Sequence, residues 1–209
     1  MHDPHAGAER VVAAFDFDKT ISTRDNVVPF LRALLGRVRL ARALLAISPR
    51  LVRAALDDDR RDAAKVALVR HTLTGYDAAR VTEVAAAFAR DVVARHLRPD
   101  VVERLTWHRA QGHDVVIVSA SFKDYLDPIG SELGVSAVLA TELAVGDDGH
   151  LTGELAGPNV RGAEKVRRLD AWLGDRPAYV WAYGDSSGDH ELLARADQGV
   201  TVGRAPASS

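Results

Sequence analysis

Acidic side chains follow two short apolar runs of the sequence, in the segments DFDKT and GDSSGD. Asp16 and Asp18 come directly after VVAAF, and Asp185 and Asp189 come after YVWAY. Two carboxylates separated by one residue repel each other, so they need a cation or a shared proton. Mg²⁺ takes oxygen ligands and keeps waters and substrate phosphate oxygens. The pattern therefore indicates a magnesium site among these aspartates. For either segment taken alone, solvated loop acids or helix N-caps are the alternative.

A hydroxyl and a lysine in the same chain are suited to an anion. Ser119 ends the apolar run VVIV, where a hydroxyl and the backbone N–H groups of a following helix form an anion site. A plain helix N-cap is the alternative for this serine. Lys165 is one of only four lysines in a chain with 23 arginines. Its compact positive charge suits binding of a phosphoryl oxygen. The alternative interpretation is that Lys165 is an ordinary solvated lysine on the surface.

The elements that must position these residues alternate along the chain. Apolar runs without a helical period predict buried strands at residues 11–15, 114–120 and 179–183, with shorter candidates at 137–140 and 199–202. Helical patterns lie between them at residues 99–111, 123–133, 162–173 and 188–196. Such alternation predicts an α/β fold, a Rossmann-like parallel sheet core with helices on both faces. In such sheets, the site forms at the carboxyl ends of the strands.

Residues 26–97 interrupt this alternation with apolar positions at helical spacing. We expect three or four helices there, with breaks near Ser48–Pro49, Asp57–Asp59 and Thr74–Gly75. The predicted organisation is an all-helical cap at residues 22–97, inserted into an α/β core made of residues 1–21 and 98–209. Alternating stretches around GDDG in residues 141–155 predict a small β-hairpin.

The motifs together resemble those of the haloacid dehalogenase-like superfamily. The resemblance rests on DFDKT, Ser119 after a strand, Lys165 before the last strands and GDSSGD, all in the family's order. The helical insertion after the first motif resembles the cap of the phosphoserine-phosphatase-type subclass. The likeness extends from about Val11 to Gly203, which is nearly the whole chain.

The resemblance implies a role for each matching acidic or basic residue. It implies that Asp16 is the nucleophile and forms an aspartyl-phosphate. It implies that Asp18 protonates the leaving alcohol and then activates water. It implies that Mg²⁺ is held by the Asp16 carboxylate, the Asp18 backbone carbonyl and Asp185. Lys165 would then neutralise negative charge, and Asp189 would orient the metal waters or Lys165.

The resemblance also implies a phosphate-binding set and a specificity residue. Thr20, Ser119 and Ala120 would bind the transferring phosphoryl group together with Lys165. Asp25 stands where phosphoserine phosphatases place a glutamate that contacts the substrate's amino group. It is therefore a candidate specificity residue, and capping a helix near Val27 is its alternative role.

Two positions depart from the pattern of phosphoserine phosphatases. Lys19 stands where those enzymes usually carry serine and many relatives carry glycine. Gly188 replaces their usual asparagine.

The amino-acid composition and net charge of the chain limit the kinds of partner and site that we expect. The net charge is −2 and cysteine is absent, so neither a global basic field for nucleic acid nor a thiolate site is expected. The polar start and the absence of a long uncharged run predict a cytoplasmic protein without a transmembrane segment.

Between residues 24 and 61, nine arginines stand against four aspartates. They predict either a solvated face or a surface for anionic lipid or a lipid-like phosphate.

The predicted function is a magnesium-dependent phosphomonoesterase that acts on a small phosphorylated metabolite. A phosphatase of a lipid phosphate, such as phosphatidylglycerophosphate, at a membrane surface is the alternative. Other classes are an esterase, with Ser186 as nucleophile and His190 or another histidine as base, and a phosphoryl-accepting or catalytically silent binding module. Magnesium-dependent hydrolysis of p-nitrophenyl phosphate, but not of the acetate ester, separates these classes.

Overall fold

A five-stranded parallel sheet forms the centre of the computed structural model, which describes residues 10–46, 48 and 59–203. The strand order is β3-β2-β1-β6-β7, and every neighbouring pair is parallel. The strands are β1 (Val11–Phe15), β2 (Asp114–Phe122), β3 (Ala137–Thr141), β6 (Tyr179–Gly184) and β7 (Gln198–Thr201). All five strands are confirmed, and they form the Rossmann-like α/β core that the alternation predicts.

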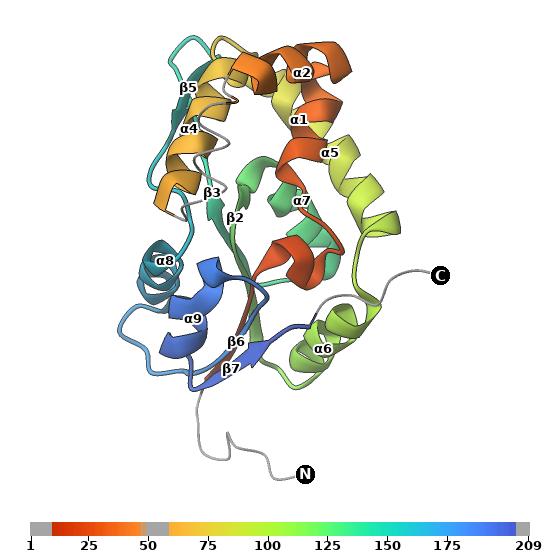
Figure 1. The fold of residues 1–209 in the computed structure, drawn as a ribbon. Helices are drawn as coiled ribbons and strands as arrows, with labels where there is room; N and C mark the ends of the chain where they lie inside the picture. The colour runs from red at the N-terminus through yellow and green to blue at the C-terminus, as the bar shows by residue number, and fades with distance from the viewer. Residues whose placement is uncertain (1–9, 47, 49–58, 204–209) are drawn as a thin grey trace.

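Both faces of the sheet are covered by helices (Figure 1). On β1, Ala13 and Phe15 point into one hydrophobic cluster, while Val12 and Ala14 point into another. The first cluster includes side chains of α6 (Pro99–Ala110) and α7 (Lys123–Leu133). The second includes side chains of α8 (Ala163–Leu173) and α9 (His190–Arg195). A strand buried on both faces needs a continuous apolar run, which VVAAF supplies.

Four described helices lie between the turn at residues 17–21 and α6. They are α1 (Val27–Leu35), α2 (Arg37–Ala46), α4 (Asp59–Leu73) and α5 (Ala78–Arg95). The predicted break at Thr74–Gly75 follows α4, whereas Pro49 and Asp57–Asp58 lie outside the described residues. Phe30 and Phe88 of this segment pack against Tyr125 of α7, with ring centroids 4.9 and 5.3 Å apart. The helical segment therefore shares its hydrophobic core with the sheet.

The helical segment between β1 and α6 begins and ends at two points that lie side by side. Ser22 forms an antiparallel bridge with Leu97. The backbone N–H of Arg98 donates to the carbonyl of Ile21, and that of Thr23 donates to the carbonyl of His96, both at 2.8 Å.

The predicted hairpin is confirmed as β4 (Leu143–Val145) and β5 (Leu151–Leu155), which pair in antiparallel fashion. Leu151 N–H donates to the carbonyl of Tyr76, and Gly75 N–H donates to the carbonyl of Leu151, both at 2.8 Å. The hairpin thus closes against the end of α4. Within the described ranges, every helix is too short or too polar to traverse a lipid bilayer.

Candidate active site

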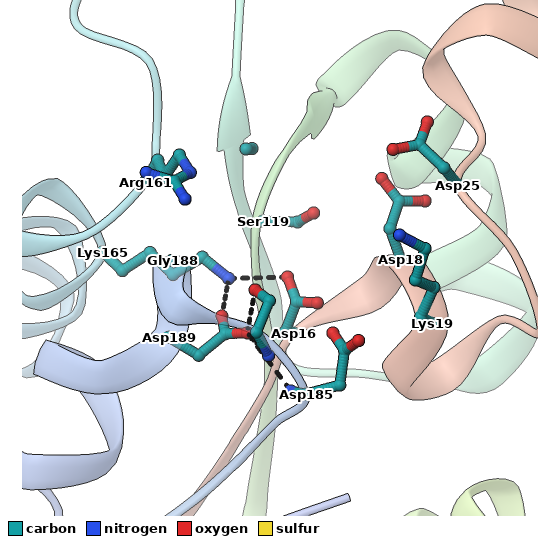
Figure 2. A pocket seen from close by; sticks show the side chains of 12 residues that line it. Asp16, Asp18, Lys19, Asp25, Ser119, Arg161, Lys165, Asp185, Gly188 and Asp189 are labelled. Carbon is teal, nitrogen blue, oxygen red and sulfur yellow. Dashed lines mark hydrogen bonds and ion pairs between the residues drawn. The ribbon is translucent and has the colours of Figure 1, made fainter. Parts of the chain in front are cut away.

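A cavity of about 220 Å³ opens at the carboxyl ends of β1, β2 and β6 (Figure 2). Such a site is expected where parallel strands end and helices begin. Its lining includes most of the side chains that the motifs singled out, namely Asp16, Asp18, Lys19, Asp25, Ser119, Ala120, Lys165, Asp185, Gly188 and Asp189. The cavity wall also contains Arg161 and Ser186.

Lys165 lies between two carboxylates at the floor of the cavity. Its Nζ is 2.6 Å from Asp16 Oδ1 and 2.5 Å from Asp189 Oδ1. All three side chains are buried. Burial raises the pKa of Asp16 from 3.8 to about 6, even though Lys165 opposes the shift. Burial alone would lower the pKa of Lys165, but the two aspartates outweigh it and the pKa is raised.

The loop after β6 is organised around Asp189. Its Oδ2 accepts hydrogen bonds from the backbone N–H groups of Asp185 and Ser186, at 3.2 and 3.1 Å, and from Ser186 Oγ at 2.8 Å. Burial opposes ionisation of Asp189, but Lys165 and Ser186 outweigh it and lower its pKa. Because Ser186 donates to a carboxylate and His190 is exposed, the contacts give no support to a serine esterase.

Three carboxylates of the site are close enough to share a cation. Oxygens of Asp16, Asp185 and Asp189 lie within 4.8 Å of one another. Burial, followed by repulsion from Asp189, raises the pKa of Asp185, whose carboxylate accepts a hydrogen bond from Thr20 Oγ1 at 3.5 Å. This oxygen-only donor set, with more negative charge than Lys165 balances, suits Mg²⁺.

Asp18 occupies a different environment from Asp16. Its Oδ1 accepts from the backbone N–H and the side-chain amide of Asn26, at 3.0 and 2.8 Å, and its Oδ2 accepts from Ser121 Oγ. Burial is the main reason that its pKa rises from 3.8 to about 7, and the nearby Asp25 adds to the effect. Asp18 is therefore a carboxyl group that carries a proton close to neutral pH.

The turn that follows Asp16 and contains Asp18 has an unusual backbone. Residues Phe17–Ile21 form a single irregular turn, in which Lys19 has a φ of 61°. This left-handed conformation favours glycine, so a lysine in it is uncommon. The turn buries Thr20 against Asp185, while Lys19 lines the cavity.

The structure places the remaining predicted residues as follows. Ser119 is buried within β2, where the pairing of β2 with β3 begins to shift register, and its Oγ accepts from the backbone N–H of Ser121 at 3.1 Å. Asp25 Oδ1 accepts from the backbone N–H of Val27 at 3.1 Å, which fits the capping role, and Asp25 also lines the cavity. The two alternatives for Asp25 are thus compatible with each other.

Sequence reasoning missed the residues that hold Asp18 and a lysine of α4 that contacts the backbone of Ala120. Asn26 and Ser121 contact Asp18, and Tyr125 OH donates to Ser121 Oγ at 2.6 Å. Lys65 reaches from α4 to the carbonyl of Ala120. The scarcity of lysine was a usable signal for Lys65, whereas the polar residues beside DFDKT and Ser119 gave none that separates them from ordinary turn residues.

Comparison with known proteins gives consistent matches. The model of a protein family described as haloacid dehalogenase-like hydrolase matches residues 13–194. The chain is 38% identical over 192 residues to the protein CicA of Caulobacter vibrioides, covering 92% of this chain and 86% of that protein. It is 31% identical over 193 residues to a Mycobacterium tuberculosis protein named "Probable phosphatase", covering 88% and 66%.

Two solved structures illustrate the likeness of fold. A Bordetella pertussis Tohama I protein with unknown function matches with a TM-score of 0.70 at 24% identity, covering 88% of this chain and 86% of that one. Phosphoserine phosphatase in its apo form matches with a TM-score of 0.63 at 18% identity, covering 90% and 84%. The family match confirms the resemblance drawn from the four motifs.

Proposed function

Because this chain belongs to the haloacid dehalogenase-like hydrolase family, we propose that it is a magnesium-dependent phosphomonoesterase that works through an aspartyl-phosphate on Asp16. The observation that carries the proposal is the pair of aspartates in DFDKT, which lie in one cavity but in unlike environments. Asp16 is ion-paired to Lys165, whereas Asp18 is held by neutral donors. Two carboxyl groups with distinct environments can act as nucleophile and as acid.

The first half of the reaction uses Asp16 and Asp18. Lys165 keeps Asp16 ionised, so that an oxygen of its carboxylate attacks phosphorus while the bond to the ester oxygen breaks. Asp18, with a pKa of about 7, gives its proton to the departing alcohol. Asn26 and Ser121 orient the carboxyl group for this transfer.

The second half returns the enzyme to its starting state. Asp18, now ionised, accepts a proton from a water that attacks the phosphorus of the aspartyl-phosphate. The bond between phosphorus and the Asp16 oxygen breaks, and inorganic phosphate is released with Asp18 protonated again. Ser119, the backbone of Ala120 and Lys165 line the space for the phosphoryl oxygens. Thr20 supports this set through Asp185, to which its hydroxyl donates.

The acidic cluster fits Mg²⁺. Asp16, Asp185 and the backbone carbonyl of Asp18 would hold the ion, with Asp189 in support, and the ion would neutralise the negative charge of the phosphoryl group.

We assign residues 22–97 to a cap that covers the cavity of a core formed by residues 1–21 and 98–209. The substrate is a small phosphorylated metabolite.

The test is hydrolysis of p-nitrophenyl phosphate with and without Mg²⁺, using p-nitrophenyl acetate as the control ester. We expect turnover of the phosphate alone, abolished in Asp16→Asn because an amide does not attack phosphorus. Beryllium fluoride should bind the wild type as an acyl-phosphate mimic and fail to bind Asp16→Asn. Substantial activity of folded Asp16→Asn contradicts the covalent mechanism. A panel of phosphorylated metabolites and lipids, with phosphatidylglycerophosphate among them, then ranks the substrates.

A further inference from the structure

Helix α2 presents arginines and aliphatic side chains together on its outer side. Arg37, Arg39 and Arg42 are exposed, and the exposed fractions of Val38 and Leu45 are 68% and 75%. We call these five residues the α2 face. Exposed aliphatic side chains of this size are few among the described residues, and two of them belong to this one helix.

The placement of these residues follows from helical geometry. Leu40 and Ala43 are buried, so one side of α2 packs onto the rest of the molecule. Val38, Arg42 and Leu45 are spaced by four and three residues, which puts them on one side of the helix. Figure 1 shows α2 at the end of the molecule opposite β7 and α9, with its outer side directed away from the sheet.

The charge on this part of the chain is positive throughout. Between Asn26 and Ala46 the sequence has four arginines, of which Arg32 is the first, and no acidic residue. No carboxylate within α1 or α2 therefore compensates the guanidinium groups. Since the whole chain has a net charge of −2, this positive charge is local. It is also remote from Lys165, which is buried between Asp16 and Asp189.

We propose that the α2 face docks on the surface of an anionic lipid bilayer. Arginine side chains bring positive charge to phospholipid headgroups, while their aliphatic stems remain in apolar surroundings. Val38 and Leu45 would enter the boundary between headgroups and acyl chains, as the apolar residues of interfacial helices do. A nucleic acid would attract the same arginines but has no apolar region into which the two aliphatic side chains could insert. The docking does not depend on which phosphate ester the cavity takes.

Sedimentation with sucrose-loaded vesicles tests the proposal on the full chain. We expect binding to vesicles of phosphatidylcholine with about 30% phosphatidylglycerol, weakening with salt, and little binding to phosphatidylcholine alone. Replacing three arginines, in Arg37→Gln/Arg39→Gln/Arg42→Gln, should weaken binding roughly 100-fold, at about fivefold for each charge. The control Arg90→Gln/Arg104→Gln/Arg176→Gln makes the same change in net charge at exposed positions elsewhere and should weaken binding only severalfold. Circular dichroism checks that both variants fold.

A fluorescent label tests insertion directly, because the chain has no cysteine of its own. Leu45→Cys carrying an environment-sensitive nitrobenzoxadiazole group should shift to the blue on anionic vesicles. The same label at Ala194→Cys, an exposed position of α9, should not shift. Equal loss of binding in the two triple variants, or no shift at residue 45, overturns the proposal. So does binding to a DNA duplex or polyglutamate at 0.15 M salt without binding to vesicles.

Discussion

Replacing Lys165 by methionine should make the stability of the protein fall more steeply with rising pH than the stability of the wild type. The methionine side chain fills the space of the lysine stem but leaves Asp16 and Asp189 buried without their shared cation. Breaking a buried ion pair by removing one partner costs about 3–5 kcal/mol. A domain has a total stability of about 5–15 kcal/mol, so the variant remains measurable.

The direction of the pH dependence follows from the two carboxyl groups. Without Lys165, burial and mutual repulsion raise the folded-state pKa values of Asp16 and Asp189 above the unfolded value of 3.8. A raised carboxyl pKa stabilises the folded state at low pH, and that contribution is lost as pH rises through the folded value. The full loss of about 3–5 kcal/mol is therefore expected near pH 8, and a smaller loss near pH 5.

Urea unfolding at both pH values, followed by tryptophan fluorescence in chelator, measures the difference between Lys165→Met and the wild type. Lys123→Met is the matched control, because Lys123 pairs with Asp127 on an exposed helix surface and such pairs contribute about 0.3–0.5 kcal/mol. A loss of stability in Lys165→Met that is the same at pH 5 and pH 8 refutes the reasoning. Phosphatase turnover of the variant should fall by about 10²–10³-fold or more.

Four further predictions concern the other carboxyl groups of the site. Asp185→Ala should sharply raise the Mg²⁺ concentration needed for turnover, because it removes one of few anionic ligands; unchanged activity in excess chelator would contradict the metal assignment. Asp18→Asn should slow the release of alkyl alcohols far more than that of p-nitrophenol, which leaves without a proton. Wild-type turnover of alkyl phosphates should fall as pH rises above about 7, where Asp18 loses its proton; a pH profile flat to 9 would refute this role. Asp25→Ala should change the ranking of natural phosphates more than it changes p-nitrophenyl phosphate turnover, and an equal loss on all substrates would assign Asp25 to helix capping alone.

The strands and the acidic cluster could be predicted because each depends on local sequence. Buried parallel strands require apolar runs such as VVAAF, and the polar residues that follow them must meet at one edge of the sheet. The environment of Asp18 could not be predicted in this way. Its partners Asn26 and Ser121 lie 8 and 103 residues away, and their donor groups depend on how the turn and β2 come together.

The packing of the helical segment on the sheet could not be predicted either, because it also depends on residues far apart in the sequence. Helical spacing predicts three or four helices but not that Phe30 and Phe88 pack onto Tyr125 of the core. Lys65 illustrates the point for a single residue. Only the packing of α4 beside β2 brings its Nζ to the carbonyl of Ala120, 55 residues along the chain.

The position of β1 in the sheet has a consequence for how the chain folds during synthesis. The strand lies between β2 and β6, so that Val12 is opposite Asp114 and Val11 is opposite Tyr179. At translation rates of about 5–20 residues per second, β1 waits roughly 10–30 s for β6 to leave the ribosome. Helices α1, α2, α4 and α5 emerge in that interval and can bury part of their apolar surface locally. The catalytic edge, which needs Asp16 beside the loop after β6, should therefore be among the last parts of the molecule to form.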